Sequence, residues 1–197
     1  DGLEIDQGIK SIVMAHASHE SFGTALDRYH PFSTDELLKL NATYTALGHY
    51  HSLNMPMNSD HQISASYPGT PEGIGFDTSE TGSRYIIFGE IGDEIGISIE
   101  QIPINTKTMK SVEIDCTTYQ TEASLIDAVR SICEKNALIE IKLNGIISPE
   151  LMPVISALPD RFRESCQYMC LKTSLLSIQT DISDDDMTIK GRAIPAE

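Results

Sequence analysis

The sequence has no apolar run that approaches the roughly 18 residues of a membrane-spanning helix. It also lacks any stretch that joins a basic start, an apolar centre and a small-residue cleavage site, so no signal peptide is visible. None of the four cysteines forms a C-x-x-C pair, which favours a reduced cytosolic setting. We therefore expect a cytoplasmic protein that does not bind membranes.

Basic residues are scarce as well. The chain has 14 lysines and arginines against 29 aspartates and glutamates, and its formal net charge is −15. A protein that binds DNA mainly through phosphate contacts needs a basic face. Any contact with nucleic acid must therefore be local, mediated by metal, or supplied by further sequence or a partner.

The hydrophobic pattern changes once along the 197 residues, which are enough for one full domain or two small ones. Strands and loops are predicted up to residue 117, and a helical period begins after it, so we place a boundary near 118. The resulting domains are 1–117 and 118–197, and the acidic tail from about 181 is predicted to be solvated. Because the chain begins with Asp1 and not with methionine, we expect it to be a fragment.

The predicted elements alternate between strands and short helices. In the first domain, buried strands are predicted at 11–15 and 44–47. Between them, a helix is predicted to begin with the capping box at 33–36 and to end near Asn41. Further strands are predicted at 63–67, 84–89, 95–101 and 111–115, with a hairpin turn at 92–94. In the second, a helix has Leu125, Ile126, Val129, Ile132 and Cys133 on one face; a strand at 138–143 ends at Gly145; a helix at 149–158 bends at Pro153; and a last strand covers 166–171.

Three histidines stand where predicted strands end. His16 follows the first strand, and His49 and His51 follow the second. Binding sites in open α/β proteins lie outside the carboxyl ends of strands, and imidazole suits zinc, manganese or iron. Gly48 allows a tight turn that could direct His49 and His51 to two different ions. His16, His49 and His51 are therefore candidate metal ligands. The alternative stays open at this point, because Gly-His-x-His fixes only three residues and a lone histidine at a strand end, such as His16, is more often a structural residue than a ligand.

The other histidines lie in predicted loops. Surface positions are expected for His19, His30 and His61, and His19 is the one close enough to His16 in the sequence to reach the same site. A His-x-His pair also occurs in cupin metal sites, but those need a glutamate at close spacing, and none lies between 52 and 60.

Taken together, the motifs resemble a known family. The motifs come in this order: Val13-Met14-Ala15-His16, Ala46-Leu47-Gly48-His49-Tyr50-His51, Tyr67-Pro68-Gly69-Thr70-Pro71-Glu72 and Gly75-Phe76-Asp77. His49 stands 33 residues after His16. This order is similar to the second half of the SbcD-type DNA repair exonucleases, which are calcineurin-like metallophosphoesterases. The resemblance covers residues 9–117 and continues weakly into 118–197, where Ile139 to Gly145 resembles a strand of the family's capping domain.

The resemblance implies an α+β fold: the distal half of a metallophosphoesterase β-sandwich with flanking helices, followed by a small α/β capping domain. It implies that His16 and His49 bind one divalent ion and His51 the other, with manganese as the expected metal. Tyr67-Pro68-Gly69 would be a structural turn close to the site. The implied function of the full-length protein is hydrolysis of phosphodiester bonds in DNA by a two-metal mechanism.

The family's D-x-H, G-D-x-x-D and G-N-H motifs are absent from this chain. We therefore assign no catalytic residue here and expect the chain alone to be inactive. The alternatives are a phosphoesterase that acts on a small phosphate ester and a non-catalytic module that docks an SbcC-like ATPase. The expected partners are DNA and that ATPase subunit for the full-length protein, together with a second copy of the chain in a homodimer.

Overall fold

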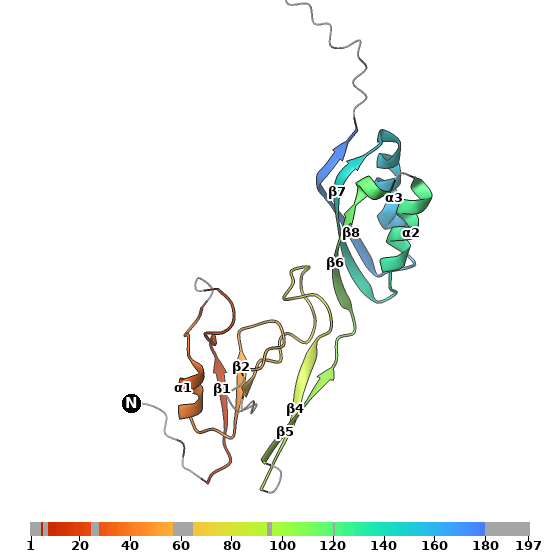
Figure 1. The fold of residues 1–197 in the computed structure, drawn as a ribbon. Coiled ribbons are helices and arrows are strands. Elements are labelled where there is room, and N and C mark those ends of the chain that lie inside the picture. The colour runs from red at the N-terminus through yellow and green to blue at the C-terminus, as the bar shows by residue number, and fades with distance from the viewer. Residues whose placement is uncertain are drawn as a thin grey trace, which may run out of the picture. The chain divides into compact units, whose positions relative to one another are not determined.

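The computed structural model describes residues 5, 8–24, 28–56, 65–93, 96–119 and 121–179 (Figure 1). Within them, eight strands in three sheets combine with three α-helices, a mixture of the kind that the α+β prediction requires. Two compact units are present: unit 1 comprises 1–111 and 136–139, and unit 2 comprises 112–135 and 140–197. The sequence pattern placed the boundary near 118. No helix in the described ranges is long and apolar enough to cross a membrane.

Unit 1 contains a parallel sheet of three strands in the order β1-β2-β3. The strands are β1 (Ile12–His16), β2 (Tyr44–Gly48) and the short β3 (Ala65–Ser66). Helix α1 (Thr34–Lys39) lies in the connection from β1 to β2 (Figure 1). Ser33 and Glu36 form the predicted capping box, in which each side chain accepts a hydrogen bond from the other residue's backbone N–H.

The two faces of this sheet differ in their cover. On one face, Leu47 and Ala65 form a core cluster with Leu37 of α1 and with Tyr67. On the other face lie Ile12, Met14 and His16, which alternate with the partly buried Val13 and Ala15. Met14 is 84% exposed. The strand therefore presents an apolar side chain to solvent on the same face that bears His16.

An antiparallel hairpin follows in unit 1, as predicted. Strand β4 (Tyr85–Gly92) pairs with β5 (Gly96–Pro103) along its whole length, from Tyr85 opposite Pro103 to Gly92 opposite Gly96. Ile86 and Phe88 of β4 are exposed on one face of this two-stranded sheet.

The third sheet has the order β6-β7-β8 and carries two helices on one face (Figure 1). Its strands are β6 (Thr108–Asp115), β7 (Ala137–Ile147) and β8 (Tyr168–Ile178). The helices are α2 (Glu122–Ile132) and α3 (Met152–Arg161), and the short 3-10 turns η1 (Cys116–Thr118) and η2 (Pro149–Leu151) precede them. In unit 2 the core comprises Ile114, Leu125, Ile126, Val129, Ile141, Leu143, Ile147, Leu151, Ile155, Leu158, Phe162 and Met169, with Cys116 and Cys166.

Three sequence predictions need correction here. Strand β7 does not end at Gly145 but runs on to Ile147, with Gly145 at a φ of +87°. An added Cβ there would overlap the side chains of Asp115 and Thr117, so glycine serves close packing within the strand.

The predicted helix at 149–158 is divided into η2 and α3. Pro153 lies in the first turn of α3, where its missing N–H needs no partner, and therefore does not bend the helix. The last strand begins at Tyr168, two residues later than predicted, and runs to Ile178, beyond the predicted end at 171. It begins later because the backbone N–H groups of Ser165 and Cys166 donate to the carbonyl of Phe162 and so belong to a turn. The acidic tail predicted from about 181 lies outside the described residues.

Candidate functional site

The parallel pairing of β1 and β2 brings two of the predicted ligands together. His16 is the last residue of β1 and pairs in register with Gly48, so His49 follows directly beside it. The ring centroids of His16 and His49 are 5.4 Å apart, with an angle of 87° between the ring planes. A Cβ at Gly48 would lie 3.1 Å from Nδ1 of His16, which is tighter than ordinary packing. Glycine thus lets the His16 ring lie against the end of β2.

The backbone at His49 is unusual. Its φ is +124°, a region that residues other than glycine rarely adopt. Holding such a conformation costs about 1–3 kcal/mol, and strained residues of this kind concentrate at functional sites. The strain accompanies the sharp turn that separates His49 from the strand and leads the chain to His51.

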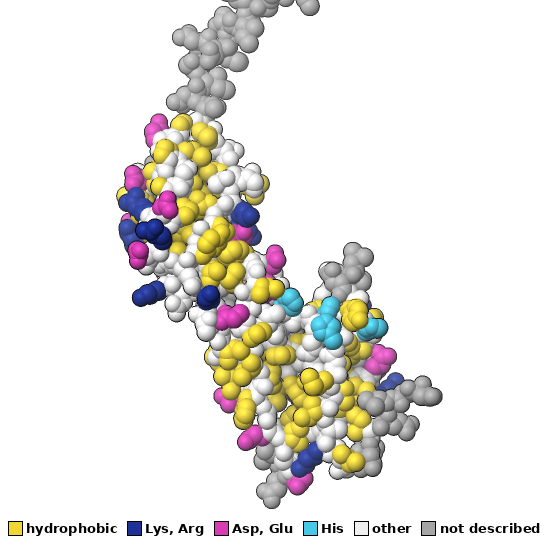
Figure 2. Space-filling model, turned by 180° about the vertical axis from the view of Figure 1, so that it is seen from behind, with side chains coloured by type: hydrophobic (Ala, Val, Ile, Leu, Met, Phe, Trp, Pro, Cys, Tyr) yellow, Lys and Arg dark blue, Asp and Glu magenta, His cyan; other side chains and the backbone are white. Residues whose placement is uncertain are grey.

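Tyr29 contacts both histidines. Its ring centroid lies 6.1 Å from that of His16, edge to face, and 6.3 Å from that of His49, nearly parallel to it. This exposed tyrosine comes from the loop between β1 and α1, which the sequence patterns did not single out. On the face of unit 1 that Figure 2 shows, histidine side chains gather in one region of the surface.

His51, the third predicted ligand, contacts a carboxylate. Its Nδ1 meets Oε1 of Glu80, a residue that is only 5% exposed. No ring contact joins His51 to His16 or His49 in the way that those two contact each other; what holds His51 is its bond to Glu80 and its backbone. Glu80 was not found from sequence because it belongs to no predicted strand and to no metal-ligand spacing. Arg84, its neighbour in space, was predicted only as the first residue of the strand at 84–89.

The pKa of Glu80 is lowered. Burial acts to raise it, but the hydrogen bonds from His51 and from the backbone N–H of Ile74, together with the electrostatic interactions with His51 and with the guanidinium of Arg84, outweigh that effect. A buried glutamate with these partners is therefore ionised at neutral pH.

His19 is not the surface residue that was predicted. It is buried, its Nε2 lies 3.0 Å from the hydroxyl of Thr34, and its ring contacts Phe22 and Phe32. Burial lowers the pKa of His19, which favours the neutral ring. It therefore supports the loop after β1 and does not reach toward His16. His30 is exposed as predicted, and His61 lies outside the described residues.

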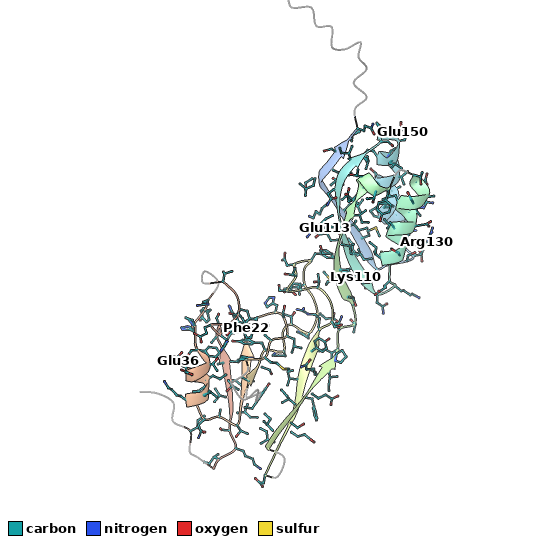
Figure 3. All side chains as sticks on the ribbon, in the orientation of Figure 1. Phe22, Glu36, Lys110, Glu113, Arg130 and Glu150 are labelled. Atoms are coloured by element: carbon teal, nitrogen blue, oxygen red, sulfur yellow. The ribbon has the colours of Figure 1, made fainter. Side chains whose placement is uncertain are left out.

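The Tyr67-Pro68-Gly69 segment, predicted as a structural turn, lies close to the site: the backbone of Tyr67 pairs with that of Asn54, and Gly69 packs against the carbonyl of His51. The hydroxyl of Tyr67 donates to the carbonyl of Ala17 at 2.8 Å and accepts from the N–H of His19 at 3.0 Å. Figure 3 shows Phe22, whose ring contacts that of Tyr67, beside the ends of β1 and β2. The hydroxyl of Tyr67 thus fixes the loop that follows His16.

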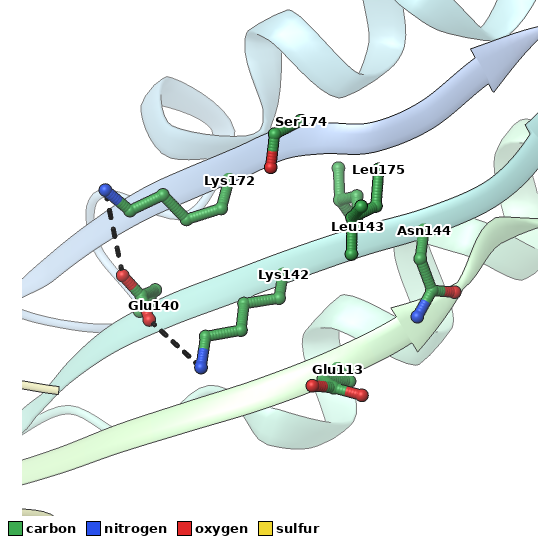
Figure 4. A pocket seen from close by; sticks show the side chains of 8 residues that line it. All are labelled: Glu113, Glu140, Lys142, Leu143, Asn144, Lys172, Ser174 and Leu175. Carbon is green, nitrogen blue, oxygen red and sulfur yellow. Dashed lines mark ion pairs between the residues drawn. The ribbon is translucent and has the colours of Figure 1, made fainter. Parts of the chain in front are cut away.

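Unit 2 has a hollow of about 310 Å³ on the open face of its sheet (Figure 4). Glu140 of β7 lies between two lysines there, 3.7 Å from Nζ of Lys142 and 4.0 Å from Nζ of Lys172. Glu113 of β6 also lines it, so two carboxylates balance two ammonium groups. The hollow offers no excess of positive charge for a phosphate backbone.

In the part of the chain that the structure describes, no group of three or more histidine, cysteine, aspartate or glutamate side chains is placed to hold a metal ion. What the strands bring together is a pair of imidazoles, His16 and His49. Two imidazoles bound to one ion through nitrogens about 2.1 Å away, at a roughly tetrahedral angle, have ring centroids about 5 Å apart. The observed 5.4 Å fits that arrangement, so the pair suits two of the positions around an ion.

Comparisons with known proteins add no assignment. No protein-family model matches the chain, and no curated protein sequence matches it either.

Proposed function

We propose that this chain is the C-terminal portion of a manganese-dependent metallophosphoesterase, a DNA repair exonuclease that hydrolyses phosphodiester bonds. The observation that supports it is the position of His16 and His49 at the carboxyl ends of two adjacent parallel strands, with ring centroids 5.4 Å apart. Ligands in that position are typical of catalytic sites in α/β sheets, and imidazole is a good ligand for divalent manganese or zinc.

In this proposal His16 and His49 bind one ion and His51 binds the other. When bound, two such ions activate water and stabilise the negative charge that develops on the phosphoryl group. The part played by this chain is to hold and orient ligands: Gly48 admits the His16 ring, and the strained turn at His49 directs the following residues. The remaining ligands and the catalytic histidine belong to the D-x-H, G-D-x-x-D and G-N-H motifs, which this chain lacks.

The open face of the first sheet supports the proposal that unit 1 is the distal half of a sandwich. Ile12 and Met14 lie exposed on the same face as His16, whereas the opposite face is covered by α1. A strand with apolar residues on both faces is typical of a sheet covered on both sides. We propose that further sequence of the full-length protein covers Ile12 and Met14 and completes the metal site.

The charges of unit 2 favour a protein partner over DNA for the capping domain. Arg161 pairs with Glu122 at 2.8 Å, and Arg130 pairs with Asp127. Residues 118–197 carry eight basic and twelve acidic residues in total. A docking role against an SbcC-like ATPase is therefore the second candidate function, and a small phosphate ester is the alternative substrate.

A metal titration followed by NMR tests the proposal. Adding Mn²⁺ should broaden the imidazole resonances of His16 and His49 before those of His30, and His16→Ala or His49→Ala should weaken this effect. His30→Ala, which removes an exposed histidine outside the predicted ligands, is the matched control. Broadening of other resonances while those of His16 and His49 stay sharp would contradict the metal site.

The activity expected of the chain alone is none, because imidazoles without a bridging carboxylate hold metal weakly. Incubation with duplex DNA and Mn²⁺ should leave the DNA intact. Robust turnover that disappears in His49→Ala would show that the chain is a complete enzyme and would refute the assignment as a portion.

A further inference from the structure

Glu80 is a buried carboxylate whose partners all belong to unit 1. One oxygen, Oε1, meets Nδ1 of His51. The other, Oε2, accepts from the backbone N–H of Ile74 at 3.2 Å and from the hydroxyl of Thr70 at 3.4 Å. Both oxygens therefore have defined partners, and the side chain of His51 is 47% exposed, so its ring is open to solvent on one side of the contact.

Arg84 joins Glu80 to the backbone of His51. Its Nη2 lies 3.6 Å from Oε2 of Glu80 and donates to the carbonyl of His51 at 2.5 Å and to the hydroxyl of Thr70 at 2.6 Å. Its Nη1 donates to the carbonyl of Ser79 at 2.9 Å. This buried guanidinium thus fixes both the carboxylate and the backbone to which the imidazole is attached.

The backbone around this network is packed so closely that glycine is required. Gly69 has a φ of +84°, and a Cβ there would overlap the carbonyl oxygen of His51. The next residue, Thr70, donates its N–H to that same carbonyl at 3.0 Å. A Cβ at Gly73 would overlap the carbonyl oxygen of Glu80. Both partners of the His51–Glu80 contact are therefore held by their main chain.

The contact decides which nitrogen of His51 carries the proton. An ionised carboxylate can only accept a hydrogen bond, so Nδ1 must be the donor. In a neutral imidazole the proton on Nδ1 leaves the lone pair on Nε2. A carboxylate that binds one ring nitrogen in this way orients a metal-binding histidine and makes it a better ligand.

We infer that Glu80 is a positioning residue for metal binding: with Arg84 it holds the His51 ring so that Nε2 is presented to a divalent cation. This inference rests on the proposed function, because it takes His51 as a ligand. The competing explanation is that Glu80 and Arg84 form a structural ion pair for which His51 is an incidental neighbour.

The first test needs no metal. The protein is labelled with ¹⁵N in its histidines, and the ring nitrogens are observed by NMR at about pH 8.5, where free imidazole is neutral. We expect His51 to carry its proton on Nδ1. Glu80→Ala should shift His51 toward the tautomer mixture of free imidazole. The control is Glu72→Gln, which alters an exposed carboxylate that accepts from Thr106 and Lys107 and touches no histidine. An unchanged His51 tautomer in a folded Glu80→Ala variant would overturn the inference.

The second test uses Zn²⁺ alone as the probe. Coordination should appear as a ¹⁵N shift at Nε2 of His51, and Glu80→Ala should weaken the affinity at His51 by about 10–100-fold. Glu80→Gln keeps an acceptor for Nδ1, so it should retain the tautomer while still weakening the affinity, and it serves if Glu80→Ala does not fold. Affinity at His51 that is unchanged in Glu80→Gln, as in Glu72→Gln, would assign Glu80 a structural role only.

The two proposals fail in different ways. If Zn²⁺ shifts His16 and His49 while the Glu80 variants leave His51 unaffected, the inference is wrong and the metal site stands. If Zn²⁺ shifts none of the three histidines, the proposed function is wrong, and the inference that depends on it falls as well.

Discussion

The two units of this protein are stabilised in different ways. Unit 2 packs long strands and two helices around apolar side chains such as Leu125, Ile141 and Leu158, all of them buried. Unit 1 has a small apolar cluster, and its loops are held by polar side chains, chiefly the hydroxyl of Tyr67 and the guanidinium of Arg84. The difference shows where function can be sought: apolar packing stabilises a scaffold, whereas buried polar networks fix particular side chains.

The largest effect is expected from removing packing in unit 2. Leu158→Ala in α3 should lower the free energy of unfolding by about 2–5 kcal/mol, because the residue is fully buried and leaves a cavity. Urea unfolding followed by NMR signals of unit 2 measures this. Leu175→Ala, at an exposed leucine of β8, is the control and should change stability by less than about 0.5 kcal/mol. Equal losses would contradict the assignment of the core.

A smaller effect is expected from a glycine that touches the candidate site. Gly69 and Gly82 share a φ of +84°, but an added Cβ has open space at Gly82 and overlaps the carbonyl of His51 at Gly69. Gly69→Ala should therefore cost about 2 kcal/mol more than Gly82→Ala, since strain in φ is common to both and the overlap is not. Thermal unfolding of both variants gives the difference, and similar costs would mean that the turn moves freely away from His51.

Tyr67→Phe removes a buried hydroxyl that bridges the loop after β1. This substitution should lower the free energy of unfolding by about 1.5 kcal/mol at neutral pH, because the backbone N–H of His19 loses its acceptor. Burial raises the pKa of Tyr67 to about 12, with a smaller contribution from Tyr50 opposed by the hydrogen bond from His19. A raised folded-state pKa means that the stability is complete below the unfolded value of about 10 and is lost as the pH rises toward about 12. The free energy of unfolding, measured at several pH values across this range, should change less with pH in Tyr67→Phe than in Tyr168→Phe, which alters an exposed tyrosine.

The smallest effect concerns the strained backbone of His49. Glycine tolerates the observed φ of +124° and alanine does not, so His49→Gly should be more stable than His49→Ala by about 1 kcal/mol. Both variants remove the imidazole ring. The difference between their free energies of unfolding, measured by chemical denaturation, therefore reports the backbone strain alone. Alanine equal to glycine would show that the turn relaxes once the imidazole is gone.

The order of elements could be predicted because it depends on local signals. The capping box at Ser33 and Glu36, the hairpin between β4 and β5 and the helical face of α2 each appear within a short window of sequence, and each is present. The extent of β7 could not be predicted, because Gly145 is usually a breaker and its role depends on side chains from β6 and η1 that lie beside it.

The site could be predicted in part for the same reason. Strand ends mark where His16 and His49 lie, and parallel pairing then brings their rings together. Glu80 and the burial of His19 could not be predicted, because their partners are 29 and 48 residues away and follow no period. Contacts of that kind form only when the chain is folded, so no short sequence motif marks the polar network around His51.

The hydrogen bond from the amide of His19 to the hydroxyl of Tyr67 couples the loop after β1 to the end of β3. An amide in a loop usually exchanges its hydrogen with water quickly, but this one is buried and its acceptor lies beside β3, 48 residues further along the chain. Its exchange should therefore be slow and should follow the opening of the β2-β3 pairing more closely than that of its own neighbours in sequence. The loop after His16 would then open only when the sheet beneath it does, and the approach to His16 would share the protection of the core.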